Sequence, residues 1–359
     1  MKKLLEVRKT GFINNLPGDA RSPESFAFPA CLTSLMECLG EDIGLETIHA
    51  HNREYLNRFA YKEYLAASGM SFGILWHPEQ CPSSFDLTQV NADHDDTIRY
   101  AFDYAGYGCE IMEKNGENVD EIRSVITESI DAGRPVLAFG IVGTPECSII
   151  CGYDDGGKIL YGYSHFQSYA PGACLENGMF IASGWETELW KIVLCGEKKE
   201  PERSLKPILE RGLTIMKKSE IDGYLAGEAA YGAWTNYVSA GTCEGMDDAA
   251  LKSYYEFHYG FVSNYAEARC YLGNFLYSRA ADDEQLQKAA ACMNEIHNTC
   301  WQVWDVCGGT DAVDGYLCLR DKAKRGELAA LIRKMRELDI DAMEALERWI
   351  QDNRFTNRP

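Results

Sequence analysis

The chain has 359 residues with 55 acidic and 35 basic side chains, which gives a formal net charge of -20. Nucleic-acid binding and binding to anionic membrane surfaces both need clustered Lys and Arg, so this charge argues against either partner. Small neutral or cationic molecules are the expected partners, and the length predicts about two domains.

The N-terminal residues carry positive charge but no sustained apolar run, so no signal peptide is predicted. No segment approaches the roughly 20 apolar residues that span a bilayer. We therefore expect a cytoplasmic protein whose 14 cysteines stay reduced. No cofactor is predicted. No metal is predicted either, because the closely spaced Cys147 and Cys151 lack the second pair and the His that a zinc site needs.

The first predicted helix covers residues 29–40, with Pro29 in its first turn and Gly40 at its end. Cys31 lies on the apolar face of this helix. Further along the chain, His77 lies in a predicted loop and is a candidate ligand-binding residue.

The centre of the chain predicts a helix followed by an antiparallel meander. Apolar residues recur at helical spacing over residues 118–132. Two apolar runs follow, residues 136–142 and 148–151, separated by a Gly-Thr-Pro break. A turn at residues 153–157 then leads into a third run, residues 158–163.

The chain changes character near residue 196, so we predict an α+β domain at residues 1–196, a charged linker at 197–203 and an all-α helical bundle at 204–359. Helices are predicted at residues 204–216, 220–237, 247–281, 283–307, 314–322 and 326–351, with a break near 338–340. Asp247, Asp283 and Asp339 lie where helix N-caps and first turns favour acidic residues.

One bundle segment, residues 257–273, contains candidate ligand-binding residues. Asn264 and Glu267 share a helix face, which places an amide and a carboxylate among small and aromatic side chains. This face either lines a wet cleft between the domains or pairs internally with an Arg such as Arg269 or Arg279. His258 belongs to the same segment and is a further ligand-binding candidate.

The order of elements around residues 133–140 and 152–155 resembles the papain-like core of C39-like cysteine peptidases, in the version found in the butirosin-biosynthesis acyltransferase family. The resemblance covers roughly residues 20–196. It implies an antiparallel sheet packed with a helix that carries the nucleophilic Cys at its start. A helical region follows the core in these relatives as well.

The resemblance assigns roles to individual positions. Ala27 stands where the family has its nucleophile, and Glu146 stands where it has the catalytic His. Cys31, one turn further on, takes the nucleophile role if the helix starts later than predicted, because a thiol is activated in the first turn. His165 stands near the place of the residue that orients the base, and either His165 or a buried Glu146 could be the base. Cys147 is a second candidate thiol and ligand-binding residue.

Three functions follow as hypotheses. The first is a cysteine-dependent amide hydrolase or acyltransferase acting on a small molecule or peptide, with an acyl donor in the second case and backbone N–H groups as oxyanion donors. The alternative is a catalytically inactive papain-like homologue that binds a small polar or cationic ligand, or a peptide, in an interdomain cleft. A structural or protein-binding role is the third.

Overall fold

The computed structural model describes residues 2–14, 16, 22–50, 53–77, 87–143, 145–168 and 174–353. The chain divides into two compact units. The first unit comprises Met1–Ile48, Glu54–Ser68 and Ile98–Arg203, and the second comprises His49–Arg53, Gly69–Thr97 and Ser204–Pro359. Two short segments of the N-terminal region are therefore grouped with the helices that follow residue 203.

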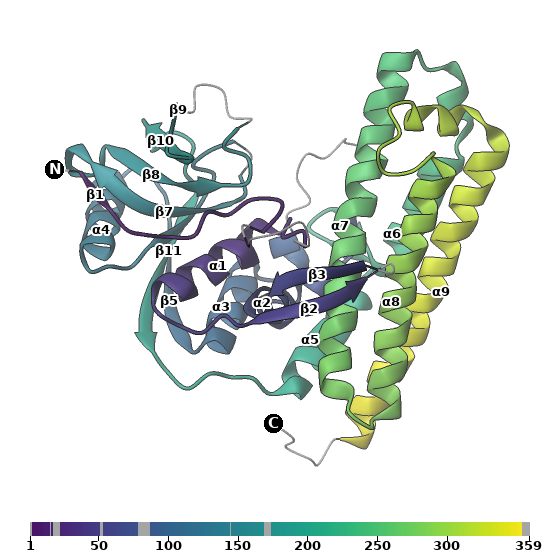
Figure 1. The fold of residues 1–359 in the computed structure, drawn as a ribbon, viewed down its shortest axis with the longest axis horizontal. Helices are drawn as coiled ribbons and strands as arrows, with labels where there is room; N and C mark the ends of the chain where they lie inside the picture. Colours follow the sequence, from purple (N-terminus) through teal and green to yellow (C-terminus); the bar gives the residue numbers. More distant parts are fainter. Residues whose placement is uncertain are drawn as a thin grey trace. The chain divides into compact units, whose positions relative to one another are not determined.

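The first unit is built on an antiparallel sheet with the strand order β5-β11-β6-β7-β8-β10-β9, in which β1 also pairs with β7 (Figure 1). The strands are β1 (Lys3–Leu4), β5 (Tyr107–Glu113), β6 (Val136–Phe139), β7 (Cys147–Asp154), β8 (Ile159–Ser164), β9 (Cys174–Glu176), β10 (Met179–Ser183) and β11 (Lys191–Lys198). Strands β6, β7 and β8 are consecutive and antiparallel, which confirms the predicted meander.

Helix α4 (Val119–Asp131) covers one face of this sheet and confirms the helix predicted there. Ile122, Ile126 and Ile130 recur every four residues and are fully buried in one cluster with Val136 and Ile150 of the sheet. The spacing puts the three isoleucines on one side of the helix, so hydrophobic burial fixes which side faces the strands.

Helix α1 (Ala27–Cys38) packs on the opposite face of the sheet. Phe28 contacts Phe139 of β6 with ring centroids 6.4 Å apart, and Cys31 approaches the backbone of Cys147 at the start of β7. The other helices and strands in this part of the chain are β2 (Leu45–Ala50), β3 (Arg53–Arg58), α2 (Phe59–Ala67), α3 (His94–Ala105) and the short 3-10 helix η3 (Asp155–Gly157).

Gly152 explains how β1 reaches β7. Leu4 of β1 lies opposite Gly152, and a Cβ atom there would come within 2.5 Å of the Lys3 carbonyl oxygen. Only glycine allows the two backbones to approach this closely, so the glycine of the 152–155 segment serves strand pairing.

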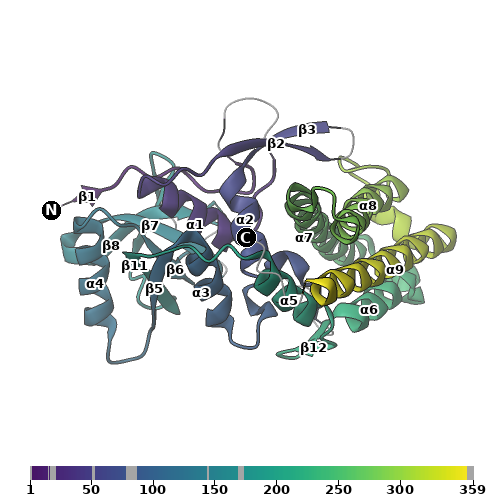
Figure 2. The same cartoon turned by 90° about the horizontal axis from the view of Figure 1, so that it is seen from below.

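The second unit is mainly helical, with α7 packed against α8 and α8 against α9 (Figure 2). Its helices are α5 (Leu205–Met216), α6 (Gly227–Ser239), α7 (Asp248–Ala280), α8 (Glu284–Val306) and α9 (Lys322–Asp352), with 3-10 helices η1 (Met70–Phe72), η2 (Leu87–Val90), η4 (Gly241–Gly245) and η5 (Gly315–Arg320). The Asp247 and Asp283 carboxylates accept N–H groups of the first turns of α7 and α8, which confirms both predicted N-caps. Across the described ranges, no helix has both the length and the apolar character required to cross a membrane.

The helix predicted at residues 220–237 is wrong in its first part. Strands β12 (Glu220–Ile221) and β13 (Tyr224–Ala226) form a hairpin there, and β13 also pairs with β4 (Leu75–Trp76). Asp222 and Gly223 join the strands with φ angles of 48° and 81°. Asp-Gly is a favoured two-residue hairpin turn because both positions need a positive φ, and this turn delays the start of α6.

The break predicted near residues 338–340 is also absent, because α9 runs without interruption. Asp339 therefore caps no helix and lies buried in the middle of α9, paired with Arg269 of α7 at 2.9 Å. Asp321 is the N-cap of α9. The residues just before it form the 3-10 helix η5 instead of the α-helix predicted at 314–322.

Candidate functional site

Helix α1 begins at Ala27, two residues earlier than predicted, with Phe26 as its N-cap. The side chain in the first turn that corresponds to the expected nucleophile is therefore a methyl group. Pro29 occupies the third helical position, where its missing N–H has no intrahelical acceptor to lose.

Cys31 lies in the second turn of α1, so the later helix start that would place it at the N-terminus does not occur. Its side chain is 0% exposed, and its Sγ atom lies 3.6 Å from the carbonyl oxygen of Cys147. The helix dipole acts mainly on the first turn, which Cys31 does not reach. These surroundings are those of a core cysteine.

His165 follows the end of β8 and is buried close to the start of α1. Its Nε2 atom lies 2.7 Å from the Glu24 carbonyl oxygen. A carbonyl only accepts hydrogen bonds, so Nε2 carries the hydrogen and Nδ1 is an acceptor. Within the described part of the chain, the buried Nδ1 atom has no hydrogen-bond partner.

The His165 ring is neutral at ordinary pH. Burial lowers the pKa of its imidazole to about 4, the hydrogen bond to Glu24 opposes this shift, and the charge of Arg58 adds to it. Phe12 contacts the ring edge-on at a centroid distance of 5.2 Å. The site therefore holds an oriented, uncharged base with one unused nitrogen.

Glu146 and Cys147 lie on the neighbouring strand. Ser148 of β7 is paired with Ser164, the last residue of β8, and His165 begins the turn that follows. Cys147 is buried, whereas Glu146 is half-buried and precedes the strand. The structure thus brings Cys31 to Cys147, where α1 meets β7, and places His165 just after β8, against Glu24 in the segment before α1.

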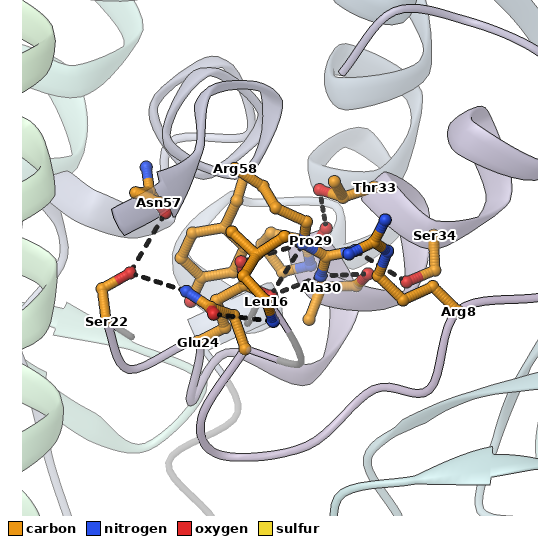
Figure 3. Close-up of polar contacts among 12 residues, drawn as sticks. Arg8, Leu16, Ser22, Glu24, Pro29, Ala30, Thr33, Ser34, Asn57 and Arg58 are labelled. Carbon is orange, nitrogen blue, oxygen red and sulfur yellow. Dashed lines mark hydrogen bonds and ion pairs between the residues drawn. The ribbon is translucent and has the colours of Figure 1, made fainter. Parts of the chain in front are cut away.

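A buried ion pair next to α1 was not anticipated from the sequence (Figure 3). Arg58 Nε donates to Glu24 at 2.9 and 3.2 Å, its Nη2 donates to the same carboxylate, and its Nη1 donates to Ser34 Oγ at 2.9 Å. Both charged side chains are 1% exposed. Burial raises the pKa of the Glu24 carboxyl, and Arg58 opposes that shift. The pair ties the segment before α1 to the end of β3.

The other ligand-binding candidates belong to the second unit. His77 is half-buried and its ring contacts Tyr224 edge-on at 5.0 Å. His258 is buried in α7, where its Nδ1 accepts a hydrogen bond from Trp234 Nε1 at 3.0 Å. Burial lowers the pKa of His258 to about 4. Its contacts with Trp234 are those of a core histidine.

Asn264 and Glu267 differ in their surroundings although they share a helix face. Asn264 is half-buried and lines a small open pocket with Gly73, Leu75 and Phe261. Glu267 is 7% exposed in the body of α7. The pocket lies within the second unit and its exposed lining is apolar, so it does not test the predicted wet cleft between the domains.

Arg269 pairs with Asp339. The predicted pairing of Arg269 with Glu267 is therefore wrong. The Arg269 guanidinium also donates to the backbone carbonyls of Ser71 and Phe72, at 2.5 and 3.3 Å. The side chain is fully buried. The charge is thus satisfied internally and secures the segment around η1 to α7.

No group of three or more His, Cys, Asp or Glu side chains in the described ranges could hold a metal ion. A scan against protein-family models and a search of curated proteins found no match for the chain.

Proposed function

We propose that this chain is a non-catalytic protein with a papain-like core, which binds a small polar molecule at His165. The observation that carries the proposal is a missing nucleophile at the start of α1 together with a buried imidazole nitrogen that has no partner in the described residues. Ala27 begins α1, while the Nδ1 atom of His165 is buried without a partner in the described residues.

A thiol nucleophile needs a low pKa and access to the substrate. Cys31 has neither the first-turn position nor any exposed surface. Cys147 is 1% exposed and enters a strand as part of the apolar interior. Neither residue is therefore accessible to a substrate.

The unused nitrogen of His165 defines the chemistry of the ligand. A buried acceptor without a partner is unfavourable by about 1–3 kcal/mol, and a ligand N–H or O–H group would remove that penalty. The charge of Arg58 lowers the pKa of His165, so it would also oppose a cation at Nδ1. A neutral donor, such as a carboxamide or an alcohol, fits best.

A thiol hydrolase or acyltransferase is the second candidate, and one observation favours it. The Glu24 carbonyl fixes the His165 tautomer, as the third member of a nucleophile–base–orienting group does in cysteine enzymes. In that case Cys31 or Cys147 would form an acyl-enzyme. A burst of p-nitrophenol from p-nitrophenyl acetate that disappears in Cys31→Ala or Cys147→Ala would support this candidate over ours.

The binding proposal is tested by nitrogen NMR of the protein labelled in its histidines, with acetamide as the neutral probe and ethanolamine as the cationic one. At roughly 1 kcal/mol per heavy atom, acetamide should bind with a Kd of about 1 mM. We expect acetamide to shift the His165 Nδ1 resonance in a saturable way. The Nδ1 atom of the buried His258 is the internal control, because it already accepts from Trp234, whereas the His258 Nε2 atom has no partner among the described residues.

Two results would contradict the proposal. The His165 resonance would stay constant over the acetamide titration, or His165 and His258 would shift in parallel without saturation, as in a general solvent effect. A response to ethanolamine alone would reject the neutral ligand and assign a cationic one. The Cys31→Ala variant should bind acetamide as the native chain does.

A further inference from the structure

Two cysteines outside the proposed site lie close enough to react with each other. Cys307 is the C-cap of α8, and Cys318 belongs to the 3-10 helix η5. Their Sγ atoms are 3.0 Å apart, and both residues are buried free thiols. A disulfide bond is about 2.05 Å long, so closing the pair requires the two sulfur atoms to approach by about 1 Å.

The backbone holds the two sulfur atoms together from both sides. Gly308 and Gly309 end α8 with φ angles of 98° and 100°, which turn the chain back toward the helix. Tyr259 Oη donates to the Thr310 carbonyl at 3.3 Å, and Arg325 Nη1 donates to the Leu319 carbonyl at 2.8 Å. The connection between the cysteines is therefore anchored near each end.

The surroundings also distinguish the two thiols. A hydrogen bond from Cys318 lowers the pKa of Cys307, burial opposes the shift, and Tyr255 and the positive charge of Lys324 lower it further. The hydrogen bond to Cys307 and burial raise the pKa of Cys318. Cys307 is thus the better nucleophile, and Cys318 is a neighbouring thiol able to resolve its oxidised form.

We propose that Cys307 and Cys318 form a reversible disulfide on oxidation by a peroxide. A small oxidant suits this site, since the residues are 5% and 4% exposed beneath an exposed connecting segment. The site is independent of His165 and of the proposed binding function.

The reaction balances in two steps. The Cys307 thiolate attacks one oxygen of hydrogen peroxide, the O–O bond breaks, and hydroxide leaves, which gives a sulfenic acid. Cys318 then loses its proton and attacks the Cys307 sulfur, the S–O bond breaks, and water leaves. The two thiols together lose two protons and two electrons, while the peroxide is reduced to two molecules of water. A dithiol such as dithiothreitol reverses the reaction by thiol–disulfide exchange.

The test treats the native full chain with hydrogen peroxide, alkylates the remaining thiols, and maps peptides by mass spectrometry without reduction. We expect a peptide pair joined through Cys307 and Cys318 that is about 2 Da lighter than the sum of its reduced parts. Dithiothreitol should abolish it, and the melting temperature should be higher for the oxidised than for the reduced form. Cys292→Ser is the matched control, because Cys292 is a buried cysteine of the same helix, and its cross-link yield should equal that of the native chain.

The Cys318→Ser variant tests the assigned roles. Without the second thiol, Cys307 sulfenic acid should accumulate and be trapped by dimedone at least several-fold more than in the native chain. The proposal is overturned if native Cys307 advances to the sulfinic acid, about 32 Da heavier, without forming the cross-link. It is also overturned if Cys318 joins the nearby Cys243 instead, or if both thiols stay reduced while other cysteines oxidise.

Discussion

Replacing Glu24 with Gln should destabilise the first unit strongly, because it leaves the Arg58 guanidinium buried without its counter-ion. Both side chains are 1% exposed, and the carboxylate accepts from two guanidinium nitrogens. Glutamine offers one acceptor oxygen but turns its amide N–H₂ toward a donor. Removing one partner of a buried pair typically costs about 3–5 kcal/mol.

The matched control is Glu37→Gln, on α1 itself. Arg8 binds Glu37 with the same bidentate geometry, at 2.6–3.1 Å, but the side chains are 31% and 28% exposed. Solvent screens this pair, so its loss should cost no more than about 1 kcal/mol. The two substitutions are chemically identical, and the largest difference between the two pairs is their burial.

Urea denaturation followed by hydrogen exchange and mass spectrometry measures both variants, since peptides of the first unit are read separately from those of the second. We expect Glu24→Gln to lower the unfolding free energy of the first unit by at least about 2 kcal/mol more than Glu37→Gln does. Equal losses would refute the reasoning, because they would mean that burial does not decide the strength of these pairs.

The remaining predictions concern pH and helix glycines. Moving the pKa of His165 from 6.5 to about 4 means that, as the pH falls below about 6.5, the unfolded chain binds a proton that the folded chain does not. The contribution of the neutral ring to the unfolding free energy is fully present above about pH 6.5. About 2 kcal/mol of it should be lost when the pH is lowered to about 5. Urea midpoints at the two pH values measure this; a His165→Phe variant should show a weaker pH dependence in the first unit, and an unchanged one would reject the assignment. The pKa of His258 is lowered in the same way, so the second unit should also lose stability as the pH falls below about 6.5. In α7, Gly260→Ala should stabilise the helix by about 1 kcal/mol because the added methyl group meets open space. Gly273→Ala should lack this gain, because its Cβ would come within 2.3 Å of Asn294 Oδ1. A higher melting temperature for Gly273→Ala than for Gly260→Ala would contradict both assignments.

The elements that the sequence predicted well are those with strong local patterns. Helix α4 follows from isoleucines at helical spacing, the β6–β7–β8 meander from apolar runs between turn residues, and the caps of α7 and α8 from Asp247 and Asp283. In each case the pattern that predicts the element lies within a few neighbouring residues, and the structure adds only which surface the element packs against.

The errors have two causes. At Asp222-Gly223 two local patterns compete, because Asp-Gly favours a hairpin turn while the spacing of the surrounding residues favours a helix. The role of Asp339 cannot be predicted from its neighbours in the sequence, because its partner is Arg269, 70 positions away. Within the candidate site, Glu24 and Arg58 escaped notice for the same reason, since their pairing depends on tertiary contact.

The most direct test of the central claim, that no activated thiol lies at α1, is the rate of iodoacetamide labelling of the native chain as a function of pH, resolved by peptide mapping. We predict that at about pH 6 Cys31 and Cys147 react far more slowly than in the urea-unfolded chain, because the reagent cannot reach side chains that are 0% and 1% exposed. Labelling of either residue at about pH 6 faster than in the unfolded chain would contradict the account and restore the cysteine-enzyme hypothesis.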